Sequence, residues 1–164
     1  MKISCIGKNY IYHFKEFDGT DAPAEPVFFL KPDTALLRNN DTFYIPDFSD
    51  EVHYETEIVV RINKVGKAIS EKYANRYYDE VGLGVDFTAR DLQREAMAKG
   101  LPWEKSKSFD RSAAISPEFL KFDEIGTSID SLAFEMSLNG EGRQQGDRAE
   151  MIFGVDRLIS YVSR

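Results

Sequence analysis

The stretch His53-Tyr-Glu-Thr-Glu57-Ile-Val-Val-Arg-Ile62 has the period-two alternation of a β-strand. Successive side chains of a strand point to opposite faces, so Glu55 and Glu57 share one face with Cα atoms about 6.6 Å apart. The opposite face carries mostly apolar side chains, which makes it candidate core. This strand places two acidic groups side by side, so the surrounding fold has to accommodate two neighbouring negative charges.

Two interpretations of the paired glutamates are open. A strand face rich in glutamate is ordinary where it meets solvent. Alternatively, the pair binds a hard divalent cation, because ligand sets made only of oxygen suit Mg²⁺, Mn²⁺ or Ca²⁺, whereas zinc favours His or Cys. A third carboxylate is then needed, and Asp86 is the best candidate because it lies on an apolar, Gly-rich strand where an unpaired carboxylate is costly to bury. Asp86 could equally cap the helix that follows.

Other strands and helices are expected on both sides of this stretch. Alternation, apolar runs or glycine spacing predict strands over residues 3–7, 27–30, 81–87 and 132–138, with an edge strand or extended segment over 43–48. Helices are predicted over 70–80 with Ser70 as N-cap, from about Thr88 to Gly100, and over the amphipathic segment from Asp147 onward. The Asn139-Gly-Glu-Gly142 run predicts a hairpin turn, and we interpret residues 140–146 as that turn and a connection to the last helix.

The composition predicts one soluble, acidic globular domain. The chain has 164 residues, of which 42% are hydrophobic and 30% charged, with a formal net charge of -7. No apolar run approaches the roughly 18 residues of a membrane span, and charge interrupts the N-terminus before a signal peptide can form. We therefore expect a cytoplasmic protein without membrane or nucleic-acid partners. Its single cysteine, Cys5, cannot form an internal disulfide.

Two further patterns suggest catalytic side chains. His13 and Glu16 are three residues apart, so a helical turn would place an imidazole beside a carboxylate that could orient it for proton transfer. The alternative is an ordinary surface pair on a helix. Lys107 follows the sole tryptophan and could stabilise an enolate or carboxylate, or could simply be solvated.

Taken together, these motifs resemble the fumarylacetoacetate hydrolase family, in particular its small acylpyruvase and oxaloacetate decarboxylase-like members. The resemblance covers nearly the whole chain and keeps the family's motif order and spacing. It rests on Cys5-Ile-Gly-Lys-Asn-Tyr10 with His13 and Glu16, Glu25-Pro-Val-Phe-Phe-Leu-Lys-Pro32, His53-Tyr-Glu-Thr-Glu57, Asp86-Phe-Thr-Ala-Arg-Asp-Leu-Gln93, Lys99-Gly-Leu-Pro-Trp103, Lys107-Ser-Phe-Asp110, Leu138-Asn-Gly140 with Arg143-Gln144, and Met151-Ile-Phe153.

The resemblance implies an α+β, mostly β fold: a mixed β-roll with short flanking helices, in one catalytic domain over residues 1–164 and commonly dimeric. It implies one Mg²⁺ or Mn²⁺ held by Glu55, Glu57 and Asp86, a catalytic dyad of His13 and Glu16 on a lid helix, and Lys107 beside the metal. Substrate contacts are implied for Lys8, Asn9, Tyr10, Arg90 and Gln93.

The implied function is a metal-dependent hydrolase that cleaves carbon-carbon bonds of acylpyruvate-type 2-oxo acids through a metal-bound enolate. Oxaloacetate decarboxylation, isomerisation of a 2-hydroxyhepta-2,4-diene-1,7-dioate type substrate, and mere binding of metal or 2-oxo acid are the alternatives. An enolate serves the hydrolase, the decarboxylase and the isomerase alike, because each needs the same electron sink.

Two departures from the family pattern stand out. Lys8 occupies a position where many members carry Arg, which keeps the charge but loses a bidentate fork for a carboxylate. Family members also continue beyond the last helix into strands with a Thr-Gly-Thr-Pro type motif. We therefore expect the chain to be a fragment that lacks those C-terminal strands; the alternative is a shortened protein whose roll has open sheet edges.

Overall fold

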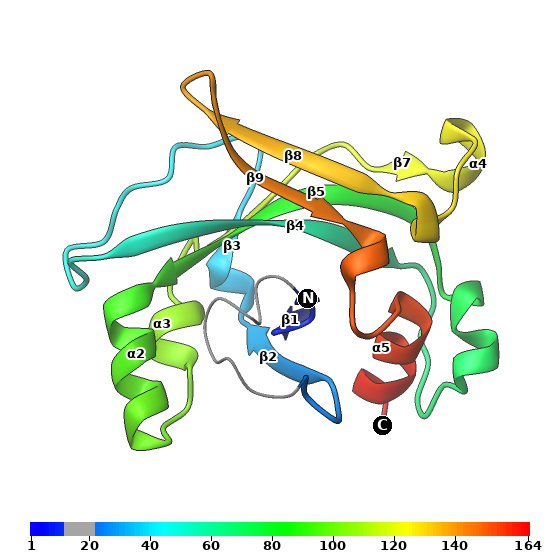
Figure 1. The fold of residues 1–164 in the computed structure, drawn as a ribbon, viewed down its shortest axis with the longest axis horizontal. Helices are drawn as coiled ribbons and strands as arrows, with labels where there is room; N and C mark the ends of the chain where they lie inside the picture. The colour runs from blue at the N-terminus through cyan, green and yellow to red at the C-terminus, as the bar shows by residue number, and fades with distance from the viewer. Residues whose placement is uncertain (12–21) are drawn as a thin grey trace. The chain divides into compact units, whose positions relative to one another are not determined.

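The computed structural model describes residues 1–11 and 22–164, which form mainly β-strands with short helices (Figure 1). The strands are β1 (Ile3–Gly7), β2 (Val27–Lys31), β3 (Leu36–Leu37), β4 (Val52–Ile62), β5 (Tyr78–Ala89), β6 (Ala113–Ile115), β7 (Leu120–Lys121), β8 (Ala133–Leu138) and β9 (Glu141–Asp147). The helices are α2 (Arg90–Lys99), α3 (Glu104–Lys107), α4 (Phe122–Ile125) and α5 (Val155–Val162). Short 3₁₀ segments are η1 (Asp33–Ala35), η2 (Glu71–Arg76), η3 (Ile129–Ser131) and η4 (Arg148–Glu150). Within the described ranges, no helix has the length and apolar character needed to cross a bilayer.

The longest strands, β4 and β5, are hydrogen-bonded neighbours in a mixed sheet (Figure 1). The strand order is β3-β6-β5-β4, and β7 also pairs with β5. β3 runs parallel to β6, whereas β6 and β7 run antiparallel to β5. β1 and β2 form one separate two-stranded sheet, and β8 and β9 form another. The predicted strands over 3–7, 53–62, 81–87 and 132–138 are therefore confirmed.

The contacts divide the described chain into two compact units. The first contains Met1–Cys5, Phe29–Val59 and Gly82–Phe119. The second contains the described part of Ile6–Phe28 together with Val60–Val81 and Leu120–Arg164. β4 and β5 contribute residues to both units.

In the first unit, Gly84 lets two strands and a side chain approach closely, as the glycine spacing predicts. A Cβ atom at Gly84 would lie 2.9 Å from Val59 Cγ2 and 3.0 Å from the carbonyl oxygen of Ala114 on β6. β4 buries less of its apolar face than the alternation predicts: Thr56 is buried, but Tyr54 and Ile62 are exposed near the two ends of the strand. The buried face is therefore confined to the middle of β4.

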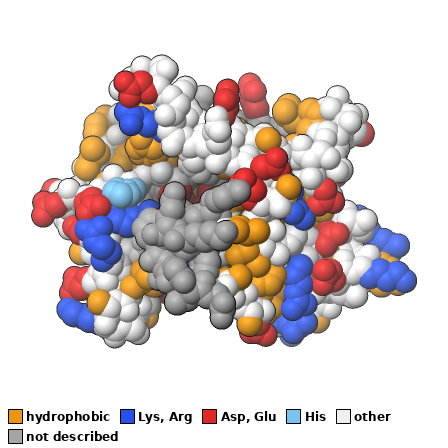
Figure 2. All heavy atoms as spheres, viewed as in Figure 1, with side chains coloured by type: hydrophobic (Ala, Val, Ile, Leu, Met, Phe, Trp, Pro, Cys, Tyr) orange, Lys and Arg blue, Asp and Glu red, His pale blue; other side chains and the backbone are white. Residues whose placement is uncertain are grey.

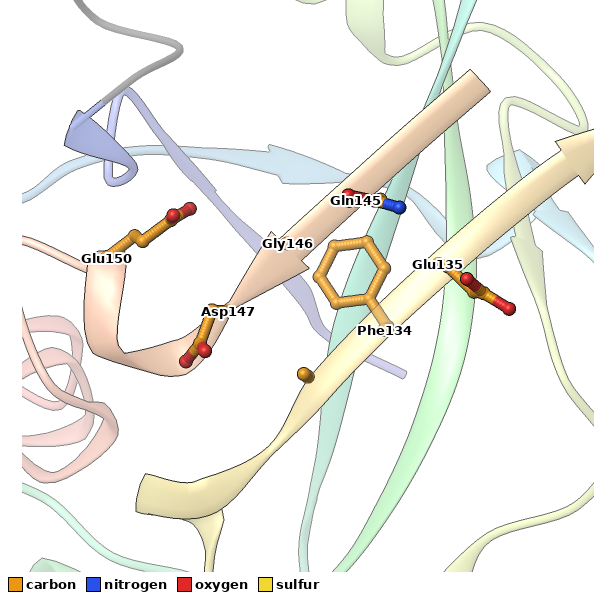
Figure 3. A pocket seen from close by; sticks show the side chains of 7 residues that line it. Phe134, Glu135, Gln145, Gly146, Asp147 and Glu150 are labelled. Atoms are coloured by element: carbon orange, nitrogen blue, oxygen red, sulfur yellow. The ribbon is translucent and has the colours of Figure 1, made fainter. Parts of the chain in front are cut away.

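In the second unit, the β8–β9 hairpin closes through Asn139 and Gly140, which both have positive φ. The expectation that residues 140–146 are only a turn and connection is wrong, because Glu141–Asp147 pairs along β8 as a full strand. The Phe134 ring explains a glycine on that strand, since a Cβ at Gly146 would lie 2.5 Å from it (Figure 3).

A cavity of about 470 Å³ opens on this hairpin. Its lining consists of Ala133, Phe134, Glu135, Gln145, Gly146, Asp147 and Glu150 (Figure 3). The ionisable side chains among these residues are all acidic, so the cavity lacks a basic or nucleophilic group for chemistry.

Several predicted helices begin later or are shorter than the sequence pattern suggests. The 70–80 segment forms the 3₁₀ turns of η2 and then the start of β5, and Ser70 makes no side-chain capping bond. The last helix begins at Val155, because Asp147 instead caps η4 by accepting a hydrogen bond from the Ala149 amide. Tyr78 secures α5 by donating a 2.9 Å hydrogen bond to Asp156.

The apolar segments 27–30 and 43–48 are more exposed than predicted. Phe28 and Leu30 alternate with covered neighbours in the two-stranded sheet, whereas a fully buried strand would hide both. Residues 43–48 form no strand, and Tyr44 and Ile45 are exposed, although Phe43 stacks on Phe87 with ring centroids 3.7 Å apart. Figure 2 shows acidic and basic side chains interspersed over the described residues of one face.

A Gly84→Ala substitution should destabilise the protein by about 1–3 kcal/mol, because the added methyl group overpacks the junction of β4, β5 and β6. Gly142→Ala is the matched control, since a Cβ there meets nothing within 4 Å. We expect Gly142→Ala to be neutral or to stabilise by up to about 1 kcal/mol. Urea unfolding measures both changes in stability, provided that the variants have the same m-value as the wild type. Equal stabilities of the two variants would contradict the close approach.

Candidate metal centre

Three carboxylates from β4 and β5 converge in the first unit. Glu55, Glu57 and Asp86 each offer an oxygen, and the three oxygens lie within 4.8 Å of one another. The alternation of β4 directs both glutamates to one face, and β5 is hydrogen-bonded to β4 and brings Asp86 beside them. Asp86 does not cap the following helix, because the chain remains extended to Ala89, which occupies the N-cap position of α2.

Lys107, the last residue of α3, lies against these carboxylates. Its Nζ is 2.6 Å from Glu55 Oε2 and 2.7 Å from Asp86 Oδ2. It also donates a 2.6 Å hydrogen bond to Thr88 Oγ1. Lys107 is 3% exposed, so the alternative of a solvated surface lysine is wrong.

A second buried lysine, Lys31 at the end of β2, contacts the other oxygen of Asp86. Its Nζ lies 2.8 Å from Asp86 Oδ1. Lys31 also donates hydrogen bonds to the Ser112 hydroxyl at 2.9 Å and to the Ser112 carbonyl at 3.0 Å. The two Asp86 oxygens are thus divided between two ammonium groups, Oδ1 to Lys31 and Oδ2 to Lys107.

The first turn of α2 completes the polar cluster. Arg90 is buried and donates hydrogen bonds to Glu55 and to Gln93, which is also buried. Its Nε points to His53 Nδ1 at 3.4 Å. The structure therefore brings six of the predicted site residues into one cluster. They are the predicted metal ligands Glu55, Glu57 and Asp86, the predicted catalytic residue Lys107, and the predicted substrate contacts Arg90 and Gln93.

The environment shifts the pKa values of these groups in opposite directions. Burial opposes the charged form of Glu55, but Lys107 and Arg90 outweigh it and lower the pKa of Glu55 to about 2. Burial, together with Asp86 and Glu55, raises the pKa of Glu57 to about 8. Burial also opposes the charged form of Lys107, yet Asp86 and Glu55 raise the pKa of Lys107.

This donor set fits a Mg²⁺ or Mn²⁺ ion. All three groups supply hard carboxylate oxygens, and no His or Cys joins the described cluster. The raised pKa of Glu57 shows that the described side chains leave negative charge incompletely compensated around it. A divalent cation would supply that compensation and favour the ionised carboxylate.

The other predicted site residues that the structure describes do not belong to the part of the first unit that forms the cluster. Lys8, Asn9 and Tyr10 belong to the second unit, where Lys8 has a φ of 57°. The Asn9 side chain bonds both backbone groups of Phe153, accepting from the amide at 2.9 Å and donating to the carbonyl at 3.0 Å. Tyr10 forms an isolated antiparallel bridge with Met151. His13 and Glu16 lie outside the described residues, so their dyad stays a prediction.

Sequence reasoning missed three buried polar residues that support the cluster: Lys31, Thr88 and Ser112. A lysine that ends an apolar run immediately before a proline was the available signal for Lys31. Ser112 and Thr88 gave none, because the lysines whose ammonium groups they contact, Lys31 and Lys107, lie 81 and 19 residues away in the sequence.

Comparison with known proteins gives the same assignment over the whole chain. The model of the fumarylacetoacetate (FAA) hydrolase C-terminal family matches residues 2–164. The mitochondrial oxaloacetate tautomerase FAHD1 of Bos taurus is 40% identical over 162 residues, covering 99% of this chain and 72% of the relative. The mitochondrial oxaloacetate decarboxylase of Dictyostelium discoideum is 39% identical over 163 residues, covering 99% and 73%.

Solved structures confirm the predicted fold. The crystal structure of fumarylpyruvate hydrolase from Pseudomonas aeruginosa in complex with Mn²⁺ and pyruvate is similar with a TM-score of 0.88 and 34% identity. The similarity covers 100% of this chain and 71% of that one. These relatives are enzymes, as the sequence motifs predict. The chain belongs to the fumarylacetoacetate hydrolase family.

Proposed function

We propose that the chain is a Mg²⁺- or Mn²⁺-dependent enzyme that converts 2-oxo acids through their enolates. The single observation that carries the proposal is the cluster of Glu55, Glu57 and Asp86 with Lys107 inside ion-pair distance. When bound, the divalent ion supplies Lewis acidity to the carboxylate and keto oxygens of a 2-oxo acid. The three carboxylates hold the ion, and the buried site keeps bulk water from weakening these interactions.

The chain's own residues then orient and stabilise the substrate. Lys107 donates hydrogen bonds from a charged, buried ammonium group, which favours negative charge developing on an adjacent oxygen. Arg90 and Gln93 present a guanidinium and an amide at the start of α2, and both suit a substrate carboxylate. His13 and Glu16 are proposed to move the proton, and Lys8, Asn9 and Tyr10 to complete the substrate site.

The first candidate reaction is keto-enol tautomerisation or decarboxylation of oxaloacetate. The observation in its favour is that relatives with these two activities in their names are 40% and 39% identical over nearly the whole chain. Both reactions need a stabilised enolate, and neither needs an attacking water.

The second candidate is hydrolysis of a carbon-carbon bond in an acylpyruvate, as the motifs suggest. The similarity to a fumarylpyruvate hydrolase bound to Mn²⁺ and pyruvate favours it. Pyruvate is also the fragment that such a cleavage releases as its enolate. The expectations of a homodimer, of a cytoplasmic location and of one catalytic domain over residues 1–164 remain predictions.

The activity test uses oxaloacetate and acetylpyruvate in separate reactions with Mg²⁺, Mn²⁺ or a chelator. NMR distinguishes the keto and enol forms of oxaloacetate from pyruvate, and acetate from intact acetylpyruvate. We expect metal-dependent turnover that Lys107→Met lowers by about 10²–10³-fold in kcat/KM. Lys105→Met is the matched control, because Lys105 lies exposed on the same helix. Equal turnover by both variants would refute the role of Lys107.

Metal binding is expected to raise the melting temperature. An ion that binds only the folded protein adds about 2.7 kcal/mol of stability at 100 times its Kd. Glu57→Gln should abolish the Mn²⁺-induced rise, because one of the three carboxylates is lost. Glu118→Gln should retain it, since Glu118 is exposed and lies outside the cluster. An undiminished rise in Glu57→Gln would place the metal elsewhere.

The metal-free protein should lose stability as the pH rises from about 5 to about 8. The folded pKa of Glu57 is raised to about 8, so in this window the folded state holds a proton that the unfolded state has released. Glu55 contributes no slope there, because its lowered pKa affects stability only at more acidic pH. Urea unfolding in chelator should show a shallower decline for Glu57→Gln than for wild type. Parallel curves would contradict the raised pKa.

A further inference from the structure

Lys31 is a buried lysine that is not among the residues assigned so far to metal or substrate. Its side chain is 0% exposed, and it stands at the end of β2, immediately before Pro32. A buried ammonium group is costly unless its donors are all used. The contacts of Lys31 therefore indicate which groups its positive charge holds in place.

Those contacts converge on the two groups that the proposed enzyme needs in place. The Nζ of Lys31 lies 2.8 Å from Asp86 Oδ1, and it also donates to the main-chain carbonyl of Lys107. Ser112 reinforces the arrangement, because its hydroxyl accepts from Lys31 at 2.9 Å and donates to the same Lys107 carbonyl at 3.0 Å. One ammonium group thus holds a candidate ligand and the backbone of the candidate catalytic lysine.

The two lysines of the cluster differ in how they are held. Lys107 donates to the side chains of Glu55, Asp86 and Thr88, two of which are candidate metal ligands. Lys31 is enclosed by two carbonyls, a hydroxyl and a carboxylate, and its Nζ lies 6.0 Å from the centre of the Phe109 ring. Of these four groups, three belong to Lys107 and Ser112, and the fourth is the carboxylate of Asp86.

We propose that Lys31 is a positioning residue that fixes the Asp86 carboxylate and the Lys107 backbone in the geometry the metal site requires. The inference rests on the proposed function. It assigns Lys31 no contact with substrate or metal. Partners of metal-binding carboxylates commonly orient their ligands in this way.

Two roles for Lys31, neutralising charge and positioning Asp86, predict opposite effects of its removal on metal affinity. If Lys31 only supplied positive charge, then Lys31→Met would remove a repelling cation and tighten Mn²⁺ binding. If Lys31 positions Asp86, then Lys31→Met should weaken Mn²⁺ binding by about tenfold or more. A purely structural role would lower the melting temperature and leave the affinity of the folded protein unchanged.

The experiment measures the Mn²⁺ Kd by electron paramagnetic resonance, at a temperature where each variant is folded. Lys99→Met is the control for loss of one positive charge, because Lys99 is exposed and pairs with Glu95 along α2, away from the candidate metal ligands. Weaker binding in Lys31→Met, with unchanged binding in Lys99→Met, is the expected result. Unchanged or tighter binding in Lys31→Met overturns the inference. Should Lys31→Met not fold, Ser112→Ala should weaken binding in the same direction by a smaller factor, and no change would overturn the inference.

A metal-free measurement separates this inference from the proposed function. We expect Lys31→Met and Asp86→Asn to be non-additive in urea unfolding, because each removes the same ion pair. Additive effects overturn the inference. Failure of the wild-type protein to bind Mn²⁺ would refute the proposed function. The urea unfolding of the two single variants and the double variant would still decide whether Lys31 holds Asp86.

Discussion

Lys107 forms ion pairs with Glu55 on β4 and Asp86 on β5, and the rest of the candidate site depends on this interaction. Neither carboxylate nor ammonium group is stable alone in a buried position, because each loses its hydration. The pairing therefore ties the end of α3 to the centre of the sheet. It also explains why the pKa of Glu55 is lowered while that of Lys107 is raised.

The pKa of Glu57 is shifted in the opposite direction to that of Glu55. Burial and two neighbouring carboxylates raise its pKa to about 8, whereas Glu55, two positions away on the same strand, is lowered to about 2. Two glutamates of one strand face thus differ because only Glu55 is paired with Lys107 and Arg90. A divalent cation bound among the three carboxylates would offset their mutual repulsion and favour the ionised form of Glu57.

The site is built on elements whose positions are fixed by backbone constraints. Gly84 allows β5 to approach β4 and β6 closely, and α2 begins directly where β5 ends at Ala89. Arg90 and Gln93 therefore lie in the first turn of α2, which follows the strand that carries Asp86 without an intervening loop. The hairpin of β8 and β9 carries an acidic cavity, but the lining of that cavity lacks the basic groups that would stabilise a developing anion.

The sequence by itself determined the β4 alternation, the shared face of Glu55 and Glu57, a strand over 81–87 that carries Asp86, and the helix that ends at Gly100. These features follow from local periodicity and from residue-specific backbone preferences. The family resemblance added the candidate metal ligands and the candidate role of Lys107. The sequence did not show that 141–147 forms a strand or that 43–48 does not, because pairing partners decide both. Only the tertiary structure revealed Lys31, Thr88 and Ser112 around the cluster, since the burial of a polar side chain depends on contacts between segments far apart in the chain.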